Sequence, residues 1–144
     1  MVVTSEKLKY VKRQIVDGNF SILNHKISTG IVYKVHVTGD LKIDGYEHSF
    51  LYITTGSSIK EHVHINDIEL YRLISGVLSV NGDIVDEDYC LLDDKHGIDR
   101  VEEDTIVETI KLSSNYLKER GIFTDCWYQM NELDKLYQKS DLPK

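Results

Sequence analysis

The stretch from Gly56 to Gly76, GSSIKEHVHINDIELYRLISG, determines how the rest of the chain is interpreted. It holds His62, His64 and Glu69, three side chains that can bind a metal ion. On a β-strand the two histidines share one face, because successive side chains alternate across the pleat. A flat strand would place Glu69 on the opposite face, so the residues before it must bend, bulge or turn if all three are to converge. The stretch predicts half of a metal site.

The same stretch resembles the first motif of the cupin superfamily: a glycine, five residues, His-x-His, three or four residues, a glutamate, six residues and a glycine. Every fixed position is filled at a permitted spacing, by Gly56, His62, His64, Glu69 and Gly76. The resemblance implies a single small cupin, an all-β protein whose antiparallel jelly-roll barrel encloses the site. It does not select an activity, because that fold hosts many unrelated functions.

A fourth ligand is also implied by the resemblance, because metal sites of this family usually take a further histidine from a second motif. His96 is the only histidine after His64, and it lies where the family places that ligand. The second motif is otherwise degenerate, since its glycine, proline, glycine and asparagine positions fall on Asp86, Leu92, Asp94 and Arg100. His96 is therefore predicted as a ligand from its position alone.

Three histidines and one glutamate suit a divalent transition metal such as manganese, iron, nickel or zinc. They leave one or two positions open on an octahedral ion, where a substrate oxygen could bind. The resemblance then offers a metal-dependent enzyme of the dioxygenase, decarboxylase or sugar isomerase type, acting on a small polar metabolite. The alternative is a non-catalytic module that binds a small ligand. No catalytic acid or base can be assigned from the sequence to decide between them.

Two tyrosines are candidates for contacts with the bound ligand. If Glu69 points into the barrel, strand alternation sends Tyr71 inward as well, although a place in the hydrophobic core is the competing interpretation. Tyr52, on the preceding strand, is a similar candidate. The remaining histidines are interpreted as structural or solvated, and these are His25, His36 and His48.

Turn residues divide the chain into short β-segments between two helical ends. Apolar residues at helical spacing predict a helix over residues 5–15. The barrel core is predicted over about 19–112, with a tight hairpin at Asn81-Gly82. A helical, aromatic tail is expected over 113–144. By length, all 144 residues are expected to form one domain.

The composition disfavours several kinds of partner. The chain has 24 acidic and 17 basic residues and a net charge of −7, whereas a nucleic-acid interface needs a concentrated basic surface. No apolar run approaches the roughly 20 residues that span a bilayer, and the first residues lack the apolar centre of a secretory signal. We therefore expect no membrane partner and a cytoplasmic location. Cys90 and Cys126 fit no zinc or redox spacing. The family likeness implies a homodimer.

Overall fold

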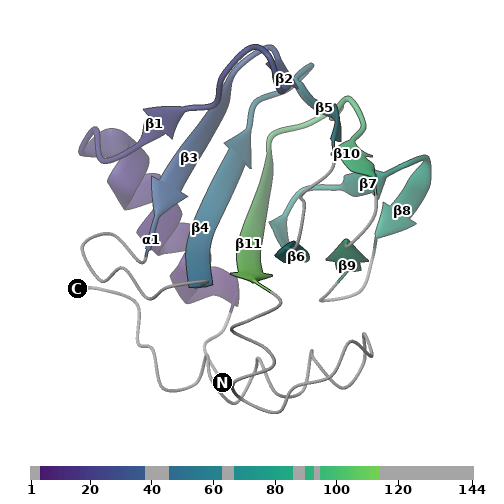
Figure 1. The fold of residues 1–144 in the computed structure, drawn as a ribbon. Coiled ribbons are helices and arrows are strands. Elements are labelled where there is room, and N and C mark those ends of the chain that lie inside the picture. The colour runs from purple at the N-terminus through teal and green to yellow at the C-terminus, as the bar shows by residue number, and fades with distance from the viewer. Residues whose placement is uncertain (1–3, 38–45, 63–66, 86–89, 93–94, 114–144) are drawn as a thin grey trace.

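The computed structural model describes residues 4–37, 46–62, 67–85, 90–92 and 95–113. Within these residues the chain forms one helix followed by eleven strands (Figure 1). No helix in the described part of the chain is long and apolar enough to cross a membrane.

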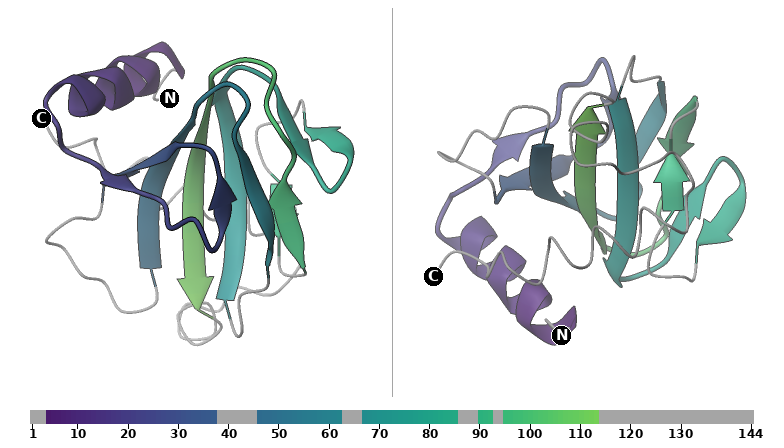
Figure 2. Two further views of the ribbon diagram at one scale, coloured as in Figure 1. Left: turned by 90° about the horizontal axis from the view of Figure 1, so that it is seen from above. Right: turned by 60° about the horizontal axis from the view of Figure 1, so that its bottom comes forward.

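The strands form two antiparallel sheets that fold around a common interior (Figure 2). The six-stranded sheet has the order β1 (Ser21–Ile22), β3 (Val32–His36), β4 (Tyr46–Ile53), β11 (Thr105–Ser113), β6 (Asp67–Ser75) and β9 (Cys90–Leu92). The five-stranded sheet has the order β2 (Ser28–Thr29), β5 (Ser58–His62), β10 (His96–Ile98), β7 (Leu78–Val80) and β8 (Asp83–Val85). The predicted all-β architecture of two antiparallel sheets is confirmed.

The interior between the sheets is an apolar core built by strand alternation, because every second residue of a strand faces it. Its buried members are Val32, Leu51, Ile53, Tyr71 and Val107 from the six-stranded sheet, and Ile59, Leu78, Val80 and Ile98 from the other. Each such side chain contributes about 1.5–3 kcal/mol through burial. This core holds the two sheets together around the candidate site.

The outer face of the six-stranded sheet is covered by α1 (Thr4–Val16), in agreement with the helix predicted over 5–15. Tyr10 and Val11 are buried there in a second apolar cluster with Phe50. Figure 2 shows α1 lying outside the sheet rather than between the sheets. Both faces of the six-stranded sheet are therefore partly buried.

The hairpin predicted at Asn81-Gly82 joins β7 to β8 and is confirmed. Both residues have positive φ, 50° and 87°, as a two-residue hairpin turn of type I′ requires. The predicted tail over 113–144 lies outside the described residues except for Ser113, and so does Cys126. The prediction that the chain is one domain stays a prediction.

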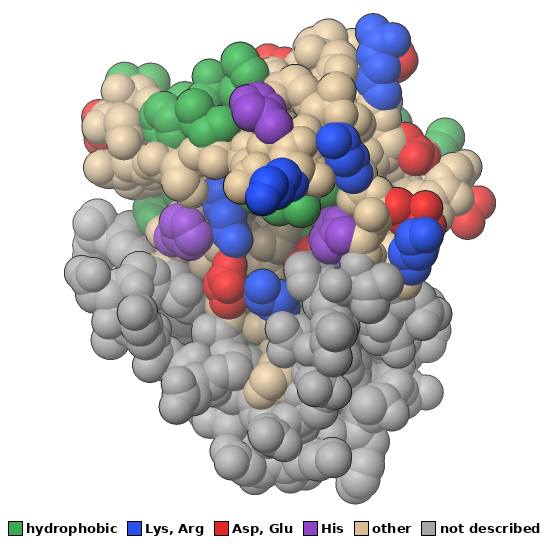
Figure 3. Space-filling view, turned by 45° about the horizontal axis from the view of Figure 1, so that its top comes forward, with side chains coloured by type: hydrophobic (Ala, Val, Ile, Leu, Met, Phe, Trp, Pro, Cys, Tyr) green, Lys and Arg blue, Asp and Glu red, His purple; other side chains and the backbone are tan. Residues whose placement is uncertain are grey.

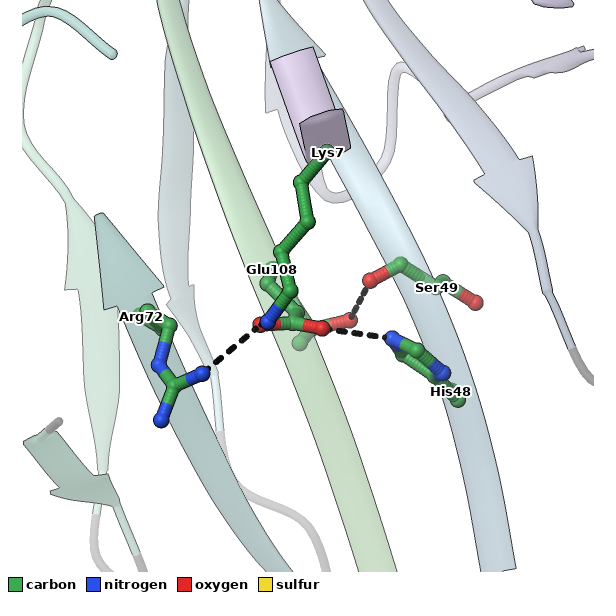
Figure 4. Close-up of polar contacts among 6 residues, drawn as sticks. Lys7, His48, Ser49, Arg72 and Glu108 are labelled. Atoms are coloured by element: carbon green, nitrogen blue, oxygen red, sulfur yellow. Dashed lines mark hydrogen bonds and ion pairs between the residues drawn. The ribbon is translucent and has the colours of Figure 1, made fainter. Parts of the chain in front are cut away.

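A buried charged network lies between α1 and the outer face of the six-stranded sheet (Figure 4). Glu108 on β11 accepts a hydrogen bond of 2.9 Å from Lys7 Nζ on α1. His48 Nε2 lies 2.8 Å from the other carboxylate oxygen, and Arg72 Nη1 lies 3.7 Å from the first. Lys7, His48 and Glu108 are each less than 5% exposed. The network ties the helix to three strands of the sheet, β4, β6 and β11.

Burial lowers the pKa of His48 below its ordinary value of 6.5, although the Glu108 carboxylate opposes the change. Burial works to raise the pKa of Glu108, but the hydrogen bond from His48 and the charge of Lys7 outweigh it, so this pKa lies below 4.5. An ionised carboxylate can only accept, so neutral His48 donates through Nε2. The unfolded chain therefore takes up protons on both groups more readily than the folded chain does.

We predict that the free energy of unfolding falls as the pH decreases from about 7 to 5, because stability rises with pH wherever the unfolded state binds more protons. His48→Gln keeps a donor for Glu108 but does not titrate. The variant should lose less stability than the wild type over this range. Urea unfolding at several pH values, with a chelator present, measures the difference. The exposed His25→Gln serves as the control, and equal pH dependence in all three proteins would contradict the prediction.

Candidate metal centre

His62 and His96 are brought together by the pairing of two neighbouring strands. β5 ends at His62, β10 begins at His96, and the two residues are direct partners in the antiparallel register. Their ring centroids lie 4.5 Å apart with the planes inclined at 65°. His96 is 1% exposed and His62 is half-buried. Two imidazoles therefore meet at one end of the five-stranded sheet.

Glu69 approaches the two imidazoles from β6 in the opposite sheet. Its Oε1 lies 3.7 Å from His96 Nε2, and the side chain is buried. One potential ligand atom from each of the three residues lies within 4.8 Å of the others. Two atoms that each lie about 2.1 Å from one ion are separated by about 3.0–3.5 Å. Imidazole nitrogens and a carboxylate oxygen at this spacing fit a divalent transition metal after a small contraction.

The orientation of His62 is fixed by the backbone of its own strand. His62 Nδ1 lies 2.7 Å from the carbonyl oxygen of Lys60. A carbonyl oxygen only accepts hydrogen bonds, so Nδ1 carries the proton and Nε2 carries the lone pair. Metal-bound histidines are commonly held in this way by a partner on the second ring nitrogen. His62 is therefore preorganised to bind a metal through Nε2.

Gly97 allows β10 to approach β5 at the site. The pairing register shifts between His96 and Ile98, and such irregularities re-aim neighbouring side chains. A Cβ atom at Gly97 would lie 2.7 Å from the carbonyl oxygen of Ile59 and 2.9 Å from the backbone nitrogen of Glu61. No other residue type fits at this separation, because both neighbouring atoms belong to the backbone.

The hairpin residue Asn81 holds the backbone on both sides of His96. Its Oδ1 accepts a hydrogen bond of 3.1 Å from the Gly97 backbone N–H. Its Nδ2 donates one of 3.1 Å to the Lys95 carbonyl oxygen. The sequence analysis missed both Gly97 and Asn81 as supporting residues. The glycine directly after the candidate histidine was the available signal.

One of the four predicted ligands, His64, lies outside the described residues. So do Ile65 and Asn66, the first half of the segment 65–68 in which the bend before Glu69 was predicted. The structure brings His62, Glu69 and His96 together. That they and His64 bind a metal stays a prediction.

The two candidate tyrosines lie on opposite faces of the six-stranded sheet. Tyr71 faces the interior, as predicted, and its ring centroid lies 6.0 Å from that of His96 at an interplanar angle of 87°. It is also a buried member of the interior core, as the competing interpretation expects. That Tyr71 contacts a bound ligand stays a prediction.

The prediction that Tyr52 contacts a ligand in the barrel is wrong. Its neighbours Leu51 and Ile53 face the interior, so alternation turns Tyr52 to the outer face. There it packs against the apolar cluster under α1. Its hydroxyl donates a hydrogen bond of 3.1 Å to Asp104, which is exposed.

Comparison with known proteins relates the chain to solved structures only. No protein-family model and no curated protein matches it. A structure described as a predicted oxalate decarboxylase from Thermotoga maritima has a TM-score of 0.54 and 20% sequence identity, covering 66% of this chain and 92% of that chain. An acetylacetone dioxygenase from Acinetobacter johnsonii has a TM-score of 0.55 and 17% identity, covering 69% of this chain and 76% of that chain.

A cupin-like protein, also from Thermotoga maritima, is similar as well, with a TM-score of 0.52 and 14% identity over 67% of this chain and 79% of that chain. At these identities the likeness concerns the arrangement of the backbone. It agrees with the motif between Gly56 and Gly76 and with the two antiparallel sheets around the candidate site. The chain therefore has the cupin fold.

Proposed function

We propose that this protein is a metal-dependent cupin enzyme that acts on a small polar metabolite. His62, Glu69 and His96, joined by His64, would hold one divalent transition metal. The observation that carries the proposal is the convergence of two imidazoles and one carboxylate from two different sheets, within 4.8 Å of one another and largely buried. Three such groups of complementary ligand chemistry fit one cation.

The residues around the centre would prepare it for binding a substrate. The Lys60 carbonyl sets the tautomer of His62, and Asn81 with Gly97 sets the position of His96. Tyr71 packs edge-on beside the His96 ring and is the proposed neighbour of a bound ligand. A metal held here would polarise a substrate oxygen and stabilise negative charge that develops on it.

Oxidative or decarboxylating chemistry is the proposed reaction class. Two similar structures carry the names of an acetylacetone dioxygenase and a predicted oxalate decarboxylase, which support this choice by analogy of fold. Oxygen uptake with acetylacetone and carbon dioxide release from oxalate are direct first assays of the metal-loaded protein. Turnover that is lost in Glu69→Ala supports the proposal. If the protein carries about one metal ion per chain but turns over neither compound, a non-catalytic binding module is favoured instead.

We predict that the purified wild-type protein carries about one divalent transition metal per chain after expression in metal-replete medium. His62→Ala, Glu69→Ala and His96→Ala should each lose it, because removing even an outer partner of a ligand costs about 10–100-fold in affinity. Elemental analysis measures the content, and circular dichroism checks the fold. The exposed His25→Ala is the matched control. Wild-type protein without metal, or ligand variants with full occupancy, would contradict the assignment.

Gly97→Ala should weaken metal binding without removing any ligand. The added methyl group would push β10 away from β5, and separate His96 from His62. We expect the affinity for Zn²⁺ to fall by about 10-fold or more, as for other losses of ligand support.

Gly18→Ala is the matched control for this variant. Gly18 follows α1, away from the candidate site, and has a positive φ with open space around it, so alanine there costs about 1 kcal/mol of stability without moving β10. Competitive titration with a zinc chelator compares the two variants. Equal zinc affinities would show that Gly97 does not position the site.

A further inference from the structure

The six-stranded sheet carries polar side chains beyond Glu69 on the same inward face. In the antiparallel register, Lys111 on β11 is the direct partner of Glu69 on one side and of Glu47 on the other. Opposed residues on neighbouring strands have Cβ atoms about 4.5–5.5 Å apart. Lys111 therefore stands next to the candidate metal ligand and is part of the same wall.

Strand alternation places the charged residues of this wall toward the interior. On β11, Val107 belongs to the interior core, so Lys111 shares its face. On β4, Leu51 belongs to the core, so Glu47 shares its face. On β3, Val32 belongs to the core, which puts Lys34 on that side. Figure 3 shows histidine, basic and acidic side chains gathered around a recess on one side of the molecule.

Two lysines share one carboxylate in this wall. Lys34 Nζ lies 2.7 Å from Glu47 Oε1, and Lys111 Nζ lies 3.7 Å from Glu47 Oε2. The side chain of Lys34 is 23% exposed, that of Lys111 is 30% exposed and that of Glu47 is 35% exposed. All three are therefore accessible at the rim of the interior. With both lysines protonated and the acid ionised, the trio has a net charge of +1.

Glu47 stays ionised at neutral pH. Burial works to raise its pKa, but the hydrogen bond and charge of Lys34, with the charge of Lys111, outweigh it and lower the pKa below 4.5. The carboxylate therefore neutralises one lysine and keeps both side chains in place. Lys111 also stands opposite Glu69, so an excess positive charge remains only when the bound cation neutralises that second carboxylate, and this charge then attracts an anion.

We infer that the substrate or ligand of this centre is a small organic anion, with a carboxylate or phosphate group bound by Lys111 while another oxygen reaches the metal site. The inference rests on the proposed function, because the anion would lie between Lys111 and the cation held by Glu69 and the histidines. A lysine ammonium suits this role, since it offers three donors and a compact charge without requiring one geometry. A neutral metabolite of the same shape would gain nothing from it.

Titration calorimetry on the zinc-loaded protein tests the inference with small probes. Malonate and inorganic phosphate represent the two anionic groups, and malonamide is the neutral counterpart of malonate. At least one anion should bind, and malonamide should bind at least 10-fold more weakly than malonate if the carboxylate is the group recognised. Lys111→Gln should weaken anion binding by about 10- to 100-fold, the range for a hydrogen bond to a charged group.

Two controls make the result specific to Lys111. The exposed Lys12→Gln on α1 removes the same charge elsewhere and should leave anion binding unchanged. Lys111→Arg keeps the charge and should restore part of the affinity. Zinc affinity is measured separately for each protein and should not change.

The outcomes separate this inference from the proposed function. Three outcomes would overturn the inference alone. The protein could bind zinc but no anion, it could bind malonate and malonamide equally and no phosphate, or Lys111→Gln could leave the anion affinity unchanged. The comparison of anionic and neutral probes on the wild type does not depend on any variant folding. Failure of the wild type to bind zinc would overturn the proposed function and the inference with it.

Discussion

The pairing of β5 with β10 is the constraint on which the candidate site depends. It places His62 opposite His96, and Gly97 permits the close approach that the pairing requires. The carboxylate of Glu69 comes from the other sheet, so the three ligands meet only when both sheets close around the interior core. The apolar packing between the sheets is therefore also what assembles the ligand set.

The six-stranded sheet uses its two faces for different purposes. The inward face carries Glu69 and the lysine wall beside it, whereas the outward face carries the Glu108 network beneath α1. β11 contributes to both, because Lys111 faces inward and Glu108 faces outward. Charges on opposite sides of one strand need separate partners, and Lys7 supplies the one for buried Glu108 beneath the helix. The helix thus compensates a buried carboxylate in addition to covering an apolar surface.

The sequence was sufficient for the fold class, for the helix and for the convergence of the ligands that the structure describes, because a local spacing carries the first motif. The sequence was insufficient for side-chain contacts between residues that are distant in the chain. Lys7 and Glu108 are 101 residues apart, and no local pattern links them. Tyr52 was misassigned because both faces of its strand are covered, so an aromatic residue does not mark the inward face. Leu51 and Ile53 show which alternate residues of β4 face the interior.

The most direct test of the account is the position of a bound metal. Crystals of the zinc-loaded protein, measured at the zinc absorption edge, locate the ion by its anomalous scattering. We predict one site per chain, with His62 Nε2, His96 Nε2 and a Glu69 oxygen at about 2.0–2.2 Å from the ion. An ion bound elsewhere, or no ion within bonding distance of these three side chains, would contradict it.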